Sequence, residues 1–176
     1  MDVMPREIPV ATAPSERALR FEAVFAANAD RIFAYARRRA ARPEAEDVVA
    51  ETFLVAWRRL EELPAEPLPW LIGVARKALA NTRRGAGRRA ALGDRLRLLA
   101  DEPVEPALEE RLTSAQSVRA ALQSLPAGER EVLELVAWDG LTPTEIAAAL
   151  GIARATVYVR LHRARQRLAG ALEEER

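Results

Sequence analysis

The chain has 176 residues, and its 27 basic and 26 acidic side chains leave a formal net charge of only +1. It has no cysteine and a single histidine, His162, which excludes disulfides, thiol catalysis, cysteine-bound zinc and any histidine-based metal cluster or catalytic triad. No run of about eighteen apolar residues and no apolar signal core is present, so we expect a soluble, cytoplasmic protein.

The charges are segregated along the chain. Segment 73–97 holds eight basic residues against one acid, whereas segment 101–110 holds five acids and no base. Such blocks indicate a charged partner at particular places. Glycine is sparse and no strand-like alternation stands out, so the sequence predicts an all-α fold.

The N-terminal half predicts four helices. Segment 1–14 mixes proline with small and polar residues, and we expect it to be flexible. A first helix can begin at Ser15, Asp30 can cap a second, and Pro43 suits the start of a third that runs to about Leu60. The core stripe of the third helix is predicted to be Val49, Phe53, Ala56, Trp57 and Leu60.

A second face of the third helix is formed by Asp47, Glu51, Leu54 and Arg58, at spacings of 4, 3 and 4 residues. A charged face of this kind is most often only solvated. The apolar Leu54 between charged neighbours indicates instead a docking surface for a basic partner helix.

Segment 61–69 contains three prolines and predicts a rigid, shaped loop. A fourth helix is expected from about Pro69 to Arg84. Its core stripe is predicted to be Leu71, Val74, Ala75, Ala78 and Leu79. A different face carries Trp70, Lys77, Asn81 and Arg84, and an aromatic ring beside cations and an amide is typical of surfaces that bind phosphates and unstacked bases. From spacing alone, Trp70 could equally be a core residue.

The organisation predicted from these features is two small helical domains joined by a flexible linker. Gly85 and Gly87 are expected to end the first domain, which covers 15–85, and the linker covers 86–113, with a helical turn or two around 92–99. The second domain is expected over 114–172, before a short tail, 173–176. Its first two helices have as core residues Val118, Ala121, Leu122 and Leu125, then Val132, Leu133, Leu135 and Val136.

Segment 142–168 predicts a helix-turn-helix. Thr142, Pro143 and Glu145 have the pattern of a capping box, and Gly151 stands where the chain must turn. The second helix has an apolar stripe of Val157, Leu161, Ala164 and Leu168, and its other faces carry Arg154, Arg160, His162, Arg163, Arg165 and Arg167. A helical hairpin with a solvated arginine face is the plainer alternative. The cap, the turn and the one-signed charge together favour a DNA reader.

With these residues the chain resembles the extracytoplasmic-function (ECF) sigma factors, the smallest type in the sigma-70 family. AEDVVAETFLVAW (45–57) resembles the family's core-binding helix of region two, and PWLIGVARKALANTRR (69–84) is similar to its promoter-melting and minus-ten helix. LPAGEREVLELV (125–136), followed by the helix-turn-helix, resembles region four. The three motifs stand in the family's order across a linker of the right kind.

The resemblance implies a specificity subunit that binds core RNA polymerase and directs promoter-specific transcription initiation. Region two would bind the largest polymerase subunit and open the minus-ten element. Region four would sit on the polymerase flap and read the minus-thirty-five element, with the acidic linker leading towards the RNA exit path. The chain itself would have no catalytic residue, metal or cofactor. An anti-sigma protein that covers both domains is a common partner of such factors.

The resemblance also assigns residues to three surfaces. The polymerase would contact Asp47, Glu51, Leu54 and Arg58. The minus-ten element would contact Pro64, Glu66, Trp70, Arg76, Lys77, Asn81, Arg83 and Arg84, with the loop holding a flipped-out base. The minus-thirty-five element would contact Arg154, Thr156, Tyr158, Val159, Arg160, His162, Arg163 and Arg165. Among these, Arg163 is the candidate for a bidentate guanine contact, and Arg160 and Arg165 are expected on phosphates.

Two other function classes fit parts of the sequence. A stand-alone helix-turn-helix transcriptional regulator would explain the C-terminal half but leaves 45–84 without a role. An enzyme acting on nucleic acid could use Asp47 and Glu51 as metal ligands. The sequence disfavours that enzyme, because it offers neither a third ligand nor a nucleophile.

Overall fold

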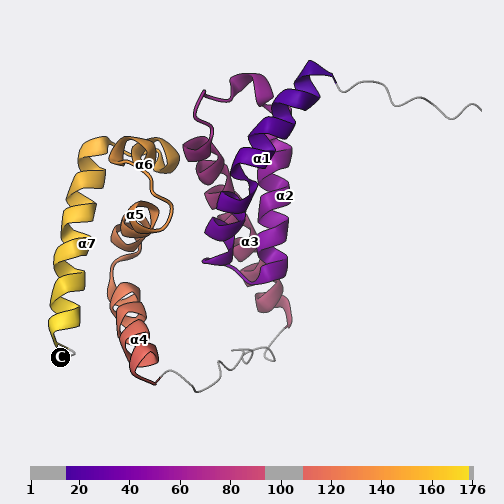
Figure 1. Cartoon of the computed structure of the whole chain (residues 1–176). Coiled ribbons are helices and arrows are strands. Elements are labelled where there is room, and N and C mark those ends of the chain that lie inside the picture. The colour runs from indigo at the N-terminus through magenta and orange to yellow at the C-terminus, as the bar shows by residue number, and fades with distance from the viewer. Residues whose placement is uncertain (1–14, 94–108, 175–176) are drawn as a thin grey trace, which may run out of the picture.

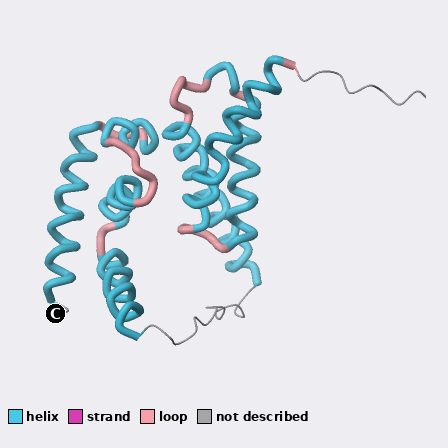
Figure 2. Tube along the Cα trace, in the orientation of Figure 1, coloured by secondary structure: helices cyan, strands magenta, loops and turns pink. Residues whose placement is uncertain are grey.

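The computed structural model describes residues 15–93 and 109–174, and within these ranges the chain is all-helical, as predicted (Figure 2). The predicted flexible segment 1–14, most of the predicted linker and the last two residues lie outside the described parts. The helices there are α1 (Glu16–Arg37), α2 (Arg42–Arg58), η1 (a 3-10 turn, Leu60–Glu62), α3 (Leu68–Gly93), α4 (Glu109–Ser124), α5 (Ala127–Ala137), α6 (Pro143–Leu150) and α7 (Arg154–Glu174).

The helices form two lobes that lie side by side (Figure 1). In the N-terminal lobe, α1, α2 and α3 pack against one another. In the C-terminal lobe, α7 packs along α4, α5 and α6. The lobes meet where α3 contacts α6, so α2 and α7 lie at opposite sides of the molecule.

The N-terminal lobe is held by apolar side chains from all three of its long helices. Ile32 of α1, Val48 of α2 and Leu71 of α3 have no solvent exposure. Four aromatic rings extend this packing between α1 and α2, and the centroids of Phe25 and Phe53 lie 4.7 Å apart. Burial of side chains of this size contributes about 1.5–3 kcal/mol each, which is why the helical stripes find one another.

α1 is one continuous helix, so the prediction that Asp30 caps a second helix is wrong. Ser15 does cap α1, and its hydroxyl accepts a hydrogen bond from the amide of Ala18. Between the two positions there is no proline or glycine. The buried Asn28 donates its side-chain amide to the carbonyl of Val24, 2.8 Å away, one turn earlier. A residue that can cap a helix marks a helix boundary only where the backbone leaves the helical conformation. At Asp30, tertiary packing keeps the backbone helical.

α3 extends to Gly93, so the predicted helix end at Arg84 is also wrong. Gly85 and Gly87 lie inside the helix. Each costs about 1 kcal/mol relative to alanine, but glycine keeps its backbone N–H and does not clash, unlike proline. Good helix formers follow at 88–92 and let the hydrogen-bonding ladder continue. Because α4 begins at Glu109, helices occupy both ends of the segment predicted as linker.

The helix-turn-helix is formed by α6 and α7, as predicted. Thr142 has extended backbone angles, its hydroxyl accepts from the amide of Glu145, and the Glu145 carboxylate accepts from the amide of Thr142 at 2.7 Å. Gly151 then has a φ of 66°, the left-handed conformation that lets the chain turn into α7. Local interactions therefore set both the start of the first helix and the turn.

Candidate functional site

The outer face of α7 is the first candidate surface. Val157, Leu161 and Ala164 are buried against the C-terminal lobe. At 100° per residue, the side of α7 opposite this stripe carries exposed side chains. These are Ala155, Val159, His162, Arg163 and Gln166. Three of them were predicted as minus-thirty-five contacts. Ala155 and Gln166 lie on the same face but were not among the predicted contacts, although their helical positions place them there.

The other predicted residues of α7 lie on its two flanks. Arg154, Tyr158 and Arg165 are exposed on one flank, and Thr156 and Arg160 are partly buried on the other. The Arg154 guanidinium donates to the Tyr158 hydroxyl at 3.2 Å and stacks over its ring. This flank therefore presents an aromatic ring and a cation together.

The arginines of α7 differ in whether they already contact other residues of the chain. Arg167 Nη1 lies 3.3 Å from the buried carboxylate of Glu129. The Arg160 guanidinium lies over Gly128, so close that an added Cβ there would meet Nη1 at 3.2 Å. Arg163 and Arg165 make no hydrogen bond or ion pair with any described residue. These two are therefore fully available to phosphates or bases.

The second candidate surface combines the loop before α3 with one face of that helix. Leu60, Leu63 and Leu68 are buried and anchor the loop, while Pro64 and Glu66 are exposed between them. The anchors hold the loop backbone against the core, and its polar tip projects into solvent.

Trp70 has features of both roles considered for it, a core residue and an aromatic ring that stacks on a base. It is partly buried and packs against the core, and the Arg59 guanidinium lies 5.9 Å from the centre of its ring. Lys77 and Asn81 are exposed on α3, and Asn81 accepts a hydrogen bond from Arg84. Arg83 belongs to the same helix, but its side chain lies outside the described residues.

Arg76, predicted as a minus-ten contact, is engaged with the other lobe. Its Nε lies 2.6 Å from Oε1 of Glu131 on α5, and its Nη2 lies 3.4 Å from Oε2. This hydrogen bond raises the pKa of the Arg76 guanidinium, which stays charged. The two residues are 55 positions apart in the chain, so no local pattern could have paired them.

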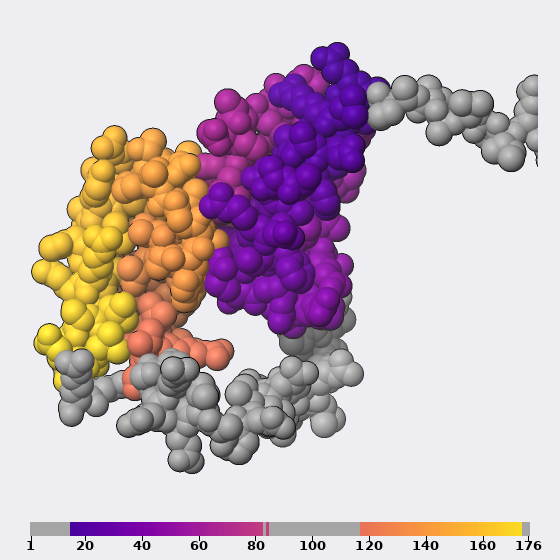
Figure 3. Space-filling model, viewed as in Figure 1, coloured from indigo at the N-terminus to yellow at the C-terminus, as the bar shows by residue number. Residues whose placement is uncertain are grey.

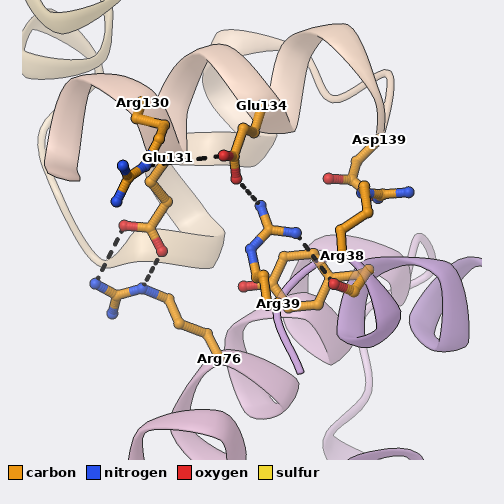
Figure 4. A network of polar contacts seen from close by, with 8 residues as sticks. Arg38, Arg39, Arg76, Arg130, Glu131, Glu134 and Asp139 are labelled. Carbon is orange, nitrogen blue, oxygen red and sulfur yellow. Dashed lines mark hydrogen bonds and ion pairs between the residues drawn. The ribbon is translucent and has the colours of Figure 1, made fainter. Parts of the chain in front are cut away.

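The Arg76 pair belongs to a larger set of contacts that joins the lobes (Figure 4). Arg39 Nη2 lies 2.7 Å from Oε2 of Glu134. Arg38 forms an ion pair with Asp139, whose backbone carbonyl accepts from Arg31 Nη2 at 2.6 Å. We call this set, Arg31, Arg38, Arg39 and Arg76 with Glu131, Glu134 and Asp139, the inter-lobe clamp.

The clamp is partly shielded from water. The Arg39 and Glu134 side chains are 12% and 15% exposed, and Asp139 is 5% exposed. Burial raises the pKa of Asp139, against the opposing effect of Arg38 and Arg39. The clamp was not predictable from the sequence, because its partners lie 55 to 108 positions apart and each looks like an ordinary surface charge.

An open groove of about 1000 Å³ lies beside the clamp, between α3 on one side and α4 and α5 on the other. Lys77 and Arg84 line one wall, and Arg119 and Arg130 line the opposite one. Figure 3 shows the lobes in contact along α6 and an opening between them beside α4. Lys77 and Arg84, two residues of the α3 face predicted to hold DNA, therefore lie across this groove from the C-terminal lobe.

The third candidate surface is on α2. Asp47, Glu51, Leu54 and Arg58 are all exposed along α2. The helix itself lies on the side of the molecule opposite α7 (Figure 1). Leu54 is 48% exposed, and none of the four bonds to another described residue. A contiguous face with an apolar centre, two acids and one base is thus open to a partner.

Two features are absent from the described ranges. Residues 15–93 and 109–174 contain no group of three histidine, cysteine or carboxylate side chains arranged to hold a metal ion. No helix in the same ranges is both long and apolar enough to cross a membrane.

Two protein-family models match the chain. The model "Sigma-70 region 2" matches residues 24–89, in the N-terminal lobe, and "Sigma-70, region 4" matches residues 115–168, in the C-terminal lobe. The matches fall on α1 to α3 and on α4 to α7, so each lobe has a family description of its own.

Curated relatives include two sigma factors. A probable RNA polymerase sigma factor, RfaY of Xanthomonas campestris pv. campestris, is 36% identical over 128 residues, which are 68% of this chain and 32% of that protein. The ECF RNA polymerase sigma factor SigL of Mycobacterium tuberculosis is 34% identical over 134 residues, 74% of this chain and 76% of SigL. The chain thus spans about a third of the first relative and about three quarters of the second.

Two solved structures are similar over most of the chain. The sigma factor RpoE of Bartonella quintana, in complex with the anti-sigma factor NepR, has a TM-score of 0.67 at 26% identity, covering 89% of this chain and 98% of RpoE. CnrH, in complex with the cytosolic domain of CnrY, has a TM-score of 0.63 at 26% identity, covering 93% of each chain.

Proposed function

Because this chain belongs to the extracytoplasmic-function group of the sigma-70 family, we propose that its lobes recognise two separate promoter elements while mounted on core RNA polymerase. It directs promoter-specific initiation in the cytoplasm, and all bond making belongs to the polymerase. The observation that carries this proposal is the pair of family matches, region 2 on one lobe and region 4 on the other. A stand-alone regulator is not favoured, since it would need only the C-terminal lobe.

The outer face of α2 is proposed to dock on the polymerase. Asp47 and Glu51 can pair with basic side chains, and Leu54 can bury its exposed side chain between them. Because these groups have no partner within the described chain, docking requires no internal contact to break. Charged groups around an apolar centre also set the orientation of the bound partner.

The loop and α3 are proposed to open and hold the minus-ten element. Unstacking a base costs a few kcal/mol, so a loop that is already anchored by Leu63 and Leu68 loses little freedom when it accepts one. Trp70 would stack a base, and Lys77, Asn81 and Arg84 would follow the strand's phosphates. Arg76 and Arg83 are proposed to extend the same track.

The outer face of α7 is proposed to enter the major groove at the minus-thirty-five element. Arg163 is unpaired and stands between Val159 and Gln166 on that face. Arginine can bond to both O6 and N7 of guanine, and a valine can contact a thymine methyl group. Arg154, Thr156, Tyr158, Arg160 and Arg165 on the flanks would position the helix through phosphates.

An anti-sigma protein is proposed as a further partner. The solved relative RpoE was captured with the anti-sigma factor NepR, and CnrH with the cytosolic domain of CnrY. Each of these two structures superposes on nearly all of this chain, both lobes included. An inhibitor that touches both lobes would block polymerase and promoter together.

The proposal is tested by adding purified chain to core polymerase and promoter DNA and mapping transcript starts. Asp47→Arg should abolish core binding and initiation while leaving thermal unfolding unchanged. Asp30→Arg, which makes the same charge change at an exposed position of α1, is the matched control and should stay active. Duplex binding without core and no initiated transcript would instead identify a stand-alone regulator.

A further inference from the structure

We propose that Gly128, in the first turn of α5, is a positioning residue for promoter binding, because it seats the guanidinium of Arg160 for contact with a DNA phosphate. The inference rests on the proposed function, in which Arg160 flanks the face of α7 that enters the major groove. It adds a residue outside α7 to that surface. Gly128 acts there through Arg160 and does not itself touch DNA.

The first support is the close fit between the glycine and the guanidinium. A Cβ built on Gly128 would stand 3.2 Å from Nη1 of Arg160, 3.3 Å from its Cζ and 3.6 Å from its Nε. Three atoms of one guanidinium therefore lie over the glycine, in the space that a side chain would take. Any larger residue at this position requires the guanidinium to shift by a few tenths of an ångström.

The second support is a contrast in charge between two arginines of α7. Arg160 and Arg167 are seven residues, or about two turns, apart and so lie on the same side of the helix, where each meets the first turn of α5. Arg167 lies 3.3 Å from the carboxylate of Glu129, whose side chain is only 10% exposed, so its charge is largely neutralised. Arg160 meets a glycine and forms no ion pair with any acid in the described part of the chain. Its positive charge therefore remains available to an anion outside the protein.

The third support is the limited freedom of the seated side chain. Arg160 is partly buried, whereas Arg163 and Arg165 are exposed. Ordering a long side chain on binding costs conformational entropy, and a side chain that is already held by contacts loses less of it. Phosphate contacts also fix the register and the angle at which a helix enters the groove. The seat is therefore expected to raise affinity for every promoter sequence alike.

The experiment replaces Gly128 with alanine in the full chain. Alanine is the better helix former, and the neighbour that must move is the end of a flexible side chain, so the free energy of unfolding should not fall. Affinity of the holoenzyme for promoter DNA should nevertheless fall about 2- to 10-fold on every minus-thirty-five sequence. The slope of log affinity against log salt should also become shallower, towards the change of about 1 expected for one lost phosphate contact. A change that only weakened the fold would lower stability and leave the slope as it was.

Two further variants show whether the effect passes through Arg160. Gly170→Ala is the matched control, because Gly170 lies in α7 and a Cβ there would meet nothing within 4 Å. It should keep the affinity and the salt slope of the unaltered chain. Arg160→Ala should show the full loss, and adding Gly128→Ala to it should weaken binding no further, since the glycine then has no guanidinium to seat.

The proposal is overturned if Gly128→Ala binds promoters as tightly as the unaltered chain or more tightly, or if its loss adds fully to that of Arg160→Ala. These results leave the proposed function intact, provided that core polymerase still initiates with the chain. Failure to bind core removes the proposed function instead. The same variants are then compared on duplex DNA with the chain alone, where the same order of affinities is expected, so the two failures are distinguishable.

Discussion

Replacing Arg163 with alanine tests how the C-terminal lobe reads DNA. Arg163 is exposed on the outer face of α7 and makes no bond to any described residue, so its removal breaks no internal contact. Alanine is also a strong helix former, and such surface changes stay within about 0.5 kcal/mol in stability. A loss in promoter binding would therefore report on DNA contacts alone.

The expected loss depends on the base. A bidentate arginine–guanine contact contributes about 1–3 kcal/mol, which corresponds to roughly 5- to 160-fold in affinity. We expect this loss of affinity only for promoters that carry guanine at one position of the minus-thirty-five element. The variant should then hardly distinguish guanine from other bases at that position. The measurement is holoenzyme affinity for a mapped promoter and for its single-base variants, at salt concentrations from about 50 to 200 mM.

Arg165→Ala is the matched control, because it makes the same charge change on the same helix and Arg165 is equally unpaired. It lies on a flank of α7, so we expect a uniform loss on every sequence and a salt slope smaller by about 1. Should Arg163→Ala also weaken all sequences equally, Arg163 would be a phosphate contact and the proposed reading geometry would be refuted.

Three further predictions concern the helix-turn-helix. Thr142→Ala should destabilise the chain by about 1 kcal/mol, because it removes the acceptor for the Glu145 amide. Denaturant unfolding measures this loss, and an unchanged free energy of unfolding would contradict the capping role. Hydrogen bonds from the Thr142 hydroxyl and amide lower the pKa of Glu145. Its contribution to stability is therefore full above about pH 4.5 and is lost as the pH falls through that lowered pKa. The thermal unfolding temperatures of the unaltered chain and of Glu145→Gln, which keeps an uncharged acceptor, should therefore converge in acid. Val157→Ala should cost about 2–3 kcal/mol, because Val157 is fully buried on the inner face of α7. Calorimetry measures this cost, and a smaller value would mean that the site collapses around the cavity.

The candidate surfaces were predictable to different degrees. The α2 face could be placed from spacing alone, since residues 47, 51, 54 and 58 recur at helical intervals and the stripe opposite them is apolar. The outer face of α7 was predicted in part, and its helical positions also identify Ala155 and Gln166. The pairing of Arg76 with Glu131 could not be predicted, because Glu131 belongs to the other lobe.

Helix limits show where local signals are weak. Asp30 has the chemistry of a cap and Gly85 the flexibility of a breaker, yet both lie inside helices. A single residue shifts helix stability by about 1 kcal/mol, and packing or a run of good helix formers outweighs it. Thr142 and Gly151 were predicted correctly because each signal there is reinforced by a neighbour within one turn.

The sequence by itself determined the all-helical class, the capped helix-turn-helix and the order of the two family motifs. It also determined most of the apolar stripes, but Val118, predicted as a core residue, is exposed. These features depend on interactions within about four residues, or on a pattern repeated along one helix. Only the tertiary structure decided that Arg38, Arg39 and Arg76 meet Asp139, Glu134 and Glu131. Those partners lie 101, 95 and 55 positions apart, and ion pairing has no periodicity that a sequence could display.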